Sequence, residues 1–192
     1  MVRLTRIYTR TGDAGDTSLA SGERARKSDP RVQTYGAVDE ANACLGMVRL
    51  HTSADVVLDP ILARVQNELF DLGADLATPV RGERAGVTAL RITDDQVKRL
   101  EQEIDQLNSE LSPLESFVLP GGSPAAAALH LARTVCRRAE QLAVALMDRP
   151  DEDVSGPALR YLNRLSDLLF TAARWTNRRG EGDVLWKPGA TR

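Results

Sequence analysis

The sequence has few cysteines, few aromatic residues and no long apolar run, and each scarcity excludes a class of protein. Its two cysteines, Cys44 and Cys136, are far apart, so no close pair is available for a zinc knuckle or a redox dithiol. No apolar run approaches the ~20 residues that cross a bilayer, and the first residues lack the apolar core of a signal peptide. We therefore expect a cytoplasmic protein with reduced thiols and no association with a membrane.

A strong charge of either sign is also missing. Lysine and arginine together number 25 and aspartate and glutamate 27, which leaves a net charge of −2. Such a balance provides no global positive field for wholesale binding of nucleic acid. Any anion must therefore be recognised by a local cluster of side chains.

Long runs rich in alanine and leucine predict an all-α protein, because aromatic residues are only 4% of the chain and alternating β-branched runs are scarce. The 192 residues suit one domain, with a flexible, glycine-containing arm at residues 1–29. A first helix is predicted with Ser28 or Asp29 as its cap and Pro30 in its first turn, and its apolar stripe is Val32, Tyr35, Val38, Leu45 and Val48. Further helices are predicted from near Pro60 to Thr78, after a Thr93 and Gln96 capping box, from Ser123 to about Met147 and from about Ser155 to Arg178. Short connections favour antiparallel neighbours, so we expect an up-and-down bundle of the ferritin-like kind.

The arm carries a polar run, TRTGDAGDTS, that begins at Thr9 and is followed by Arg24, Arg26 and Lys27. Glycines let a backbone turn its N–H groups inward, hydroxyls add donors, and nearby cations neutralise an anion. The run therefore suits a phosphate cradle, although it is not a Walker A loop, since no Gly-Lys-Ser/Thr follows the glycines. A polar, flexible turn explains the same pattern.

Two further sets of polar residues recur at helical spacing. Asp39 and Asn42 fall among the apolar positions of the first helix, which predicts that both lie on or beside its buried stripe and need partners. His130, Arg133, Arg137 and Glu140 recur at steps of three and four on the fourth helix. This second stripe suits a polyphosphate clamp, but a solvated face is the alternative. Asn163 on the last helix is either part of the same clamp or a satisfied core amide.

The chain also lacks the motifs by which enzymes provide their own nucleophile or metal. There is no nucleophile elbow and no CxxC, and neither His51 nor His130 has a glutamate three residues before it, as a di-iron bundle would require. These absences fit a reaction whose nucleophile arrives with the substrate.

Four blocks resemble the ATP:cob(I)alamin adenosyltransferases of the propanediol-utilisation type: YTRTGDAGDTSL, YGAVDEANACLG, FVLPGGSPAAAALHLARTVCRRAE and YLNRLSDLLF. They occur in the family's order between Ile7 and Phe170, and a set of four is far more specific than any one block. The resemblance implies a homotrimer of five-helix bundles with active sites at subunit interfaces. There the arm of one subunit closes over ATP held partly by its neighbour.

The resemblance also implies a role for each matching residue. The ATP-binding residues carried over are Thr9, Arg10, Thr11, Gly12, Thr17, Lys27, Arg137, Glu140 and Asn163. Asp39 is implied to pair with Arg133 across the interface, and Phe117 to lie against the corrinoid, where it displaces the lower cobalt ligand. Arg137, Phe117, Asp39 and Arg133 are thus the expected catalytic residues.

The implied reaction transfers the 5′-deoxyadenosyl group of ATP to cob(I)alamin and releases triphosphate. Reduced cobalt is itself the nucleophile, so the protein's task is to orient ATP and stabilise the departing charge. Mg²⁺ is expected to arrive with ATP, without a dedicated protein site. Compatible protein partners are a cobalamin reductase and an adenosylcobalamin-dependent mutase. The alternatives are an ATP-dependent phosphotransferase and a non-catalytic helical corrinoid carrier.

Overall fold

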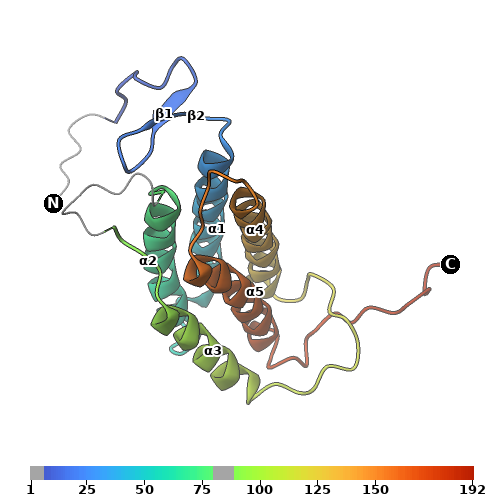
Figure 1. The fold of residues 1–192 in the computed structure, drawn as a ribbon. Helices are drawn as coiled ribbons and strands as arrows, with labels where there is room; N and C mark the ends of the chain where they lie inside the picture. The colour runs from blue at the N-terminus through green and yellow to red at the C-terminus, as the bar shows by residue number, and fades with distance from the viewer. Residues whose placement is uncertain (1–6, 80–88) are drawn as a thin grey trace.

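The computed structural model describes residues 7–79 and 89–192, and five helices make up most of that part (Figure 1). They are α1 (Pro30–Thr52), α2 (Leu58–Leu76), α3 (Asp94–Asn108), α4 (Pro124–Met147) and α5 (Gly156–Thr176). Helix α1 packs against α2 and α4, and α5 packs against α4 and α3 (Figure 1). Each helix runs roughly opposite to the one before it. The five predicted helices are therefore confirmed, although the expected break after the second helix falls largely on residues 80–88, outside the described part.

The helices begin where their capping residues predict. Asp29 accepts a hydrogen bond from Arg31 N at 2.8 Å, and Thr93 forms the expected capping box with Gln96. Ser123 and Ser155 cap α4 and α5 in the same way, each with a proline in the first helical turn. Sequence and local structure agree at these positions because a cap satisfies backbone N–H groups that have no partner within the helix.

Leucine and alanine from all five helices form one continuous core. The predicted stripe of α1 is confirmed at Val38, Leu45 and Val48, which are buried. It is wrong in the first turns, where Arg31 and Thr34 are buried while Val32 and Tyr35 are only partly covered. Arg31 tolerates burial because it donates to Glu152 at 2.6 Å and to the Leu76 carbonyl at 2.7 Å. Because α1 is covered by α2 on one side and α4 on another, its buried face is wider than a single apolar stripe.

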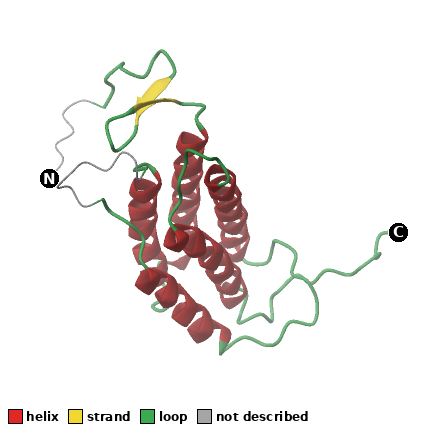
Figure 2. Cartoon of the chain, viewed as in Figure 1, coloured by secondary structure: helices red, strands yellow, loops and turns green. Residues whose placement is uncertain are grey.

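The prediction of an all-α chain is wrong in the arm, where two short strands pair (Figure 2). β1 (Asp16–Ser18) and β2 (Arg24–Arg26) are antiparallel, with Thr17 opposite Ala25. The hairpin is attached to the bundle, because Leu19 is buried and Ala20 N donates to the Ala77 carbonyl at 3.1 Å. Three-residue polar strands have no apolar alternation, so the sequence pattern could not reveal them.

None of the helices in the described ranges is both long and apolar enough to cross a membrane.

Candidate active site

The hairpin folds the polar run of the arm into a compact loop. Gly15 N donates to the Gly12 carbonyl at 3.1 Å, and Lys27 N donates to the Gly15 carbonyl at 2.9 Å. The ammonium of Lys27 is so close to Gly12 that a Cβ there would lie 3.2 Å from Nζ. Thr11 is held by a 2.9 Å hydrogen bond from Arg24 to its carbonyl. Backbone turns, hydroxyls and a cation thus meet in one place, as a phosphate cradle requires.

The other arm candidates lie around this loop. Thr9 and Thr11 share a hydrogen bond between their hydroxyls at 2.9 Å, and Thr17 lies on β1. Arg10 has a φ of 63°, and its guanidinium lies 5.5 Å from the ring centre of Tyr8. A left-handed arginine is uncommon and turns the chain sharply at the start of the cradle.

A second group of candidates meets between α4 and α5. Arg137, Glu140 and Asn163 line a cavity of about 350 Å³. Asn163 Nδ2 donates to Glu140 Oε1 at 2.8 Å, and Asn163 Oδ1 accepts from Arg164, so Asn163 is a positioned amide at the edge of a cavity. Arg137 is exposed and makes no hydrogen bond or ion pair with any residue that the structure describes. It is therefore available for an anionic ligand.

Phe117, Arg133 and Phe170 line another cavity, of about 480 Å³, which we call the Phe117 cavity. The Phe117 ring is 77% exposed and stands edge-on to Trp186 at 5.9 Å between centroids. Arg133 Nε is buried without a partner in the described part of the chain, and burial together with the charge of Arg137 lowers the pKa of Arg133. An apolar ring and an unsatisfied cation thus face one hollow.

His130 is a buried neighbour of Phe170, which lines this cavity. Its side chain is 1% exposed and packs against Phe170, with ring centroids 6.2 Å apart. Neither ring nitrogen has a hydrogen-bond partner among residues 7–79 and 89–192. Burial lowers the pKa of His130, so the neutral imidazole is favoured.

Asp39 was predicted to lie on or beside the buried stripe of α1 together with Asn42, and the structure places it beside the buried face rather than on it. Its side chain is exposed in a groove of about 430 Å³ between α1 and α2, whereas Asn42 is buried and donates to the Gln66 carbonyl at 3.0 Å. The physical reason is the wide buried face of α1, which centres on Ala37, Ala41 and Leu45 and leaves Asp39 at its margin. Asp39 forms no ion pair within the described ranges.

One chain therefore holds its candidates in separate places. The hairpin that carries the cradle lies at the N-terminal end of α1 (Figure 1). Asp39 lies in the groove between α1 and α2, and Arg133 and Arg137 lie on α4. No hydrogen bond or ion pair between described residues joins the cradle to Arg137, or Asp39 to Arg133. A complete site cannot be assembled from these contacts alone.

Two aromatic residues near Phe117 were not among the predicted site residues: Phe170, which lines the Phe117 cavity, and Trp186, whose ring contacts that of Phe117. Phe170 lies seven residues after Asn163 on α5, a helical spacing that places both on one side of the helix. That spacing could have been read from the sequence. Trp186 lies in the segment DVLWKPG near the C-terminus, which is similar to the family's, but nothing in that segment predicts a contact with the distant Phe117.

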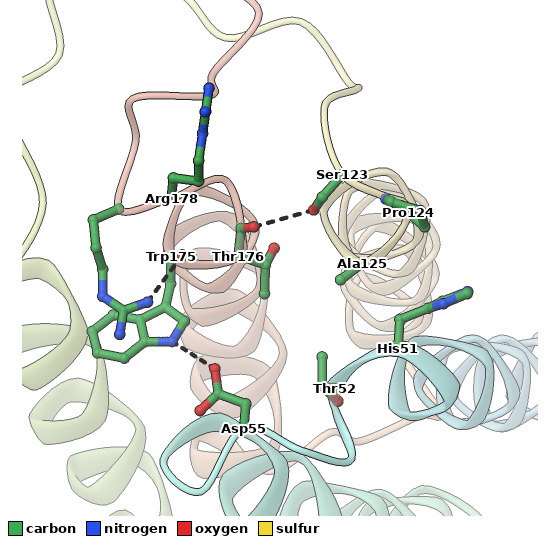
Figure 3. Close-up of a pocket in the computed structure, with 10 residues that line it drawn as sticks. His51, Thr52, Asp55, Ser123, Pro124, Ala125, Trp175, Thr176 and Arg178 are labelled. Atoms are coloured by element: carbon green, nitrogen blue, oxygen red, sulfur yellow. Dashed lines mark hydrogen bonds between the residues drawn. The ribbon is translucent and has the colours of Figure 1, made fainter.

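A further cavity, of about 480 Å³, opens at the end of the bundle where α1 and α5 finish and α4 begins (Figure 3). Trp175 Nε1 donates to Asp55 at 2.9 Å there, and Ser123 Oγ donates to the Thr176 carbonyl at 3.2 Å. None of the predicted ATP or corrinoid residues lines it. These contacts instead fix the C-terminal end of α5.

Comparison with known proteins gives a consistent family. Residues 7–176 match the family of proteins described as cobalamin adenosyltransferase. A corrinoid adenosyltransferase of Mycobacterium tuberculosis is 50% identical over 191 residues, which cover 100% of this chain and 97% of that protein. One from Bacillus subtilis is 43% identical over 189 residues, covering 96% and 94%.

Solved structures agree. A variant of a PduO-type ATP:corrinoid adenosyltransferase from Lactobacillus reuteri, complexed with cobalamin and ATP, superposes with a TM-score of 0.85 at 38% identity. The match covers 95% of this chain and 99% of that one. A family match over residues 7–176 and a sequence identity of 50% over the full length show common descent, not merely a shared helical architecture. The chain therefore belongs to the cobalamin adenosyltransferase family, and within it to the PduO type.

Proposed function

We propose that this chain transfers the 5′-deoxyadenosyl group of ATP to the cobalt of cob(I)alamin, forming adenosylcobalamin and releasing triphosphate. The observation that carries the proposal is the Arg137 cavity, where an unpaired guanidinium lies beside the hydrogen-bonded pair Glu140 and Asn163. The cobalt electron pair attacks the ribose 5′ carbon while the bond from that carbon to the α-phosphate oxygen breaks. The protein then has to orient ATP and stabilise the departing negative charge.

In this proposal ATP is bound by the cradle and the α4–α5 cavity together. Thr9, Arg10, Thr11, Gly12, Thr17 and Lys27 come from the cradle, and Arg137, Glu140 and Asn163 from the cavity. Lys27 and Arg137 neutralise the phosphates from two sides, because each is a cation at the edge of its own group. The cradle and the cavity then act on one substrate although one chain keeps them apart.

Mg²⁺ would enter with ATP. Glu140 is the single carboxylate among the residues that line the α4–α5 cavity, which fits an ion held mainly by phosphate oxygens and water. The ion would supply positive charge to the phosphates in addition to that of Arg137 and Lys27. The residues here therefore bind the nucleotide and orient its leaving group, while the ion moderates its charge.

Phe117, Asp39 and Arg133 would hold the corrinoid. Phe117 presents an exposed ring to the cavity that it shares with Arg133 and Phe170. If that ring occupies the place of the lower cobalt ligand, the ligand is excluded. A cobalt(II) ion without its lower ligand is easier to reduce, so binding energy is spent on activating the metal. A cobalamin reductase would supply the electron, and an adenosylcobalamin-dependent mutase would take up the product.

The separation of the groups supports a homotrimer with shared sites. Arg133 and Asp39 are opposite charges that find no ion-pair partner among the described residues of one chain, and each lies at a different groove. Large apolar side chains are also exposed on α1, α2 and α4, the kind of patch that subunits cover. They are Met47, Leu50, Phe70, Leu131 and Met147. In a closed ring, Asp39 of one subunit would meet Arg133 of the next.

A subunit-mixing experiment tests this arrangement. Asp39→Ala and Arg133→Ala should each be nearly inactive alone, because each leaves a charge unpaired at every interface. When the two variants are unfolded and refolded together, about one interface in four regains an intact Asp39–Arg133 pair and activity returns at those sites. The measurement is adenosylcobalamin formation by the mixed trimers, with mass determined by light scattering.

The matched control is the double variant Asp39→Ala/Arg133→Ala refolded with itself, which restores no interface. If the mixture is as inactive as its parents while the trimer forms, the two residues do not meet across an interface. Monomeric wild-type protein with full activity would refute shared sites altogether.

A further inference from the structure

The C-terminal tail holds the loop that carries Phe117. Leu119 N donates to the Val184 carbonyl at 2.7 Å, and Trp186 N donates to the Phe117 carbonyl at 2.8 Å. Ser116 Oγ also donates to the Trp186 carbonyl at 2.8 Å, and the Trp186 ring contacts that of Phe117. The loop and the tail thus form a short antiparallel ladder, outside the helices, next to the C-terminal end of α5 (Figure 1).

A buried ion pair fixes the start of this tail. Arg174 Nε on α5 donates to Asp183 Oδ2 at 2.8 Å, and the two side chains are only 6% and 3% exposed. Arg174 Nη2 donates in addition to the Ser112 carbonyl at 2.7 Å, at the other end of the Phe117 loop. The pair therefore joins three segments: the helix, the loop and the tail.

Asn177 completes the connection. Its Nδ2 donates to Asp183 Oδ1 at 3.2 Å and to the Gly121 carbonyl at 3.3 Å, while its Oδ1 accepts from Ser123 N at 2.9 Å. Gly122 has a φ of 98°, and a Cβ there would lie 2.3 Å from Asn177 Oδ1. Arg174, Asn177 and Asp183 together form what we term the tail anchor.

The backbone between α5 and the tail is strained. Arg178 and Arg179 have φ values of 53° and 59°, and Gly180 follows at 93°. Two successive left-handed arginines persist only where surrounding contacts determine them. Those contacts are present. The guanidinium carbon of Arg179 lies 3.2 Å from the ring centre of Trp175, and Trp175 Nε1 donates a hydrogen bond to Asp55 (Figure 3). The sharp reversal returns Asp183 to Arg174.

Asp183 is not among the residues that line the Phe117 cavity, so it acts on that cavity through the tail. Without Asp183 the tail would lose its buried attachment, and the exposed ring of Phe117 would retain few contacts of its own. The hydrogen bonds of the ladder join the tail to Phe117 itself and to Ser116 and Leu119 on either side of it. The position of the tail therefore determines the position of the ring.

We propose that the tail anchor is a positioning device for Phe117: it fixes the tail, and the tail holds the ring where it displaces the lower cobalt ligand. Asp183, Arg174 and Asn177 are thus positioning residues for cobalt activation. The inference rests on the proposed role of Phe117 and adds the element that makes that role possible on an otherwise exposed loop.

Asp183→Asn tests the proposal, since it keeps the shape and removes the charge. Adenosylation that depends on a protein reductant acting on bound cob(II)alamin should fall about 10-fold, within the cost of misplacing a catalytic group. Adenosylation of chemically prepared cob(I)alamin should stay close to wild type. The electron paramagnetic resonance spectrum of bound cob(II)alamin should show a smaller four-coordinate fraction.

Asp94→Asn is the matched control, because Asp94 pairs with Arg160 in an exposed ion pair outside the candidate cavities. It should change neither assay. In a Phe117→Ala background, Asp183→Asn should add no further loss to the reductase-dependent rate, as expected for two residues that act through one ring. Should Asp183→Asn fail to fold, Arg174→Lys provides the same readouts, because it keeps the charge and loses the reach to Ser112.

Equal losses in both assays, or losses that add to those of Phe117→Ala, would reduce the anchor to a purely stabilising contact. An unchanged four-coordinate fraction in Asp183→Asn would overturn the proposal as well. The role of Phe117 is judged separately. If Phe117→Ala loses equally in both assays, the proposed role of the ring fails, whatever Asp183→Asn does.

Discussion

Arg137→Ala should lower the turnover number for adenosylcobalamin formation by about two to three orders of magnitude, the usual cost of removing one donor to developing charge. The side chain lies in the α4–α5 cavity beside Glu140 and Asn163 and has no partner in the described part of the protein. Its loss should therefore disturb no internal contact. Steady-state kinetics with saturating cob(I)alamin measure the effect, and light scattering checks that the variant assembles as the wild type does.

Arg160→Ala is the control for this substitution. Arg160 is also a helical arginine, but its partner is the exposed Asp94 at 2.6 Å and it lines none of the described candidate cavities. Truncating such a residue typically changes stability by less than about 0.5 kcal/mol and should leave turnover unchanged. Equal turnover in Arg137→Ala and Arg160→Ala would show that the α4 stripe is a solvated face, which is the alternative interpretation of its sequence.

Phe117→Ala should reduce reductase-dependent adenosylation by about 100-fold or more, since even a misplacement of about 1 Å can cost that much. Only the step that needs four-coordinate cobalt(II) depends on the ring. The variant should therefore lose much less when chemically prepared cob(I)alamin is supplied. Paired assays with the two cobalt oxidation states measure the difference.

Thermal stability separates this role from a core role. A fully buried phenylalanine costs about 3–5 kcal/mol when truncated, but the Phe117 ring is 77% exposed and stands edge-on to Trp186. The melting temperature of Phe117→Ala should accordingly stay near that of the wild type. A large fall in melting temperature, with equal losses in both assays, would identify Phe117 as a plug of the bundle end.

Much of the fold could be predicted from the sequence because its signals are local. A side-chain oxygen just before a helix accepts a hydrogen bond from a backbone N–H of the first turn. The structure confirms this cap at Asp29, Thr93 and Ser123. The i, i+4 and i+7 spacing of Arg133, Arg137 and Glu140 likewise predicts that they lie along one side of α4. Such local rules need no knowledge of the partner elements.

The errors lie where a partner element decides the outcome. Asp39 and Asn42 were predicted to lie on or beside the buried stripe, but the spacing alone could not tell which of the two would be covered. The packing of α2 and α4 on α1 buries Asn42 and leaves Asp39 exposed at the margin. The tail anchor was missed for a related reason. Arg174 and Asp183 are charged residues that periodicity assigns to solvent, and only the left-handed reversal after α5 buries them together. Long-range pairing of this kind leaves no local trace in one sequence.

If the chain breaks the bond between the ribose and the phosphates of ATP, all three phosphates leave together, and the identity of the phosphate product decides the reaction. Purified protein should be incubated with Mg²⁺-ATP, with and without cob(I)alamin, and the phosphates separated by anion-exchange chromatography. Triphosphate should form in step with adenosylcobalamin, and none should form without the corrinoid. ADP as the phosphate product would instead indicate a phosphotransferase, and intact ATP beside bound corrinoid would indicate a carrier without turnover; either result would contradict adenosyl transfer by this chain.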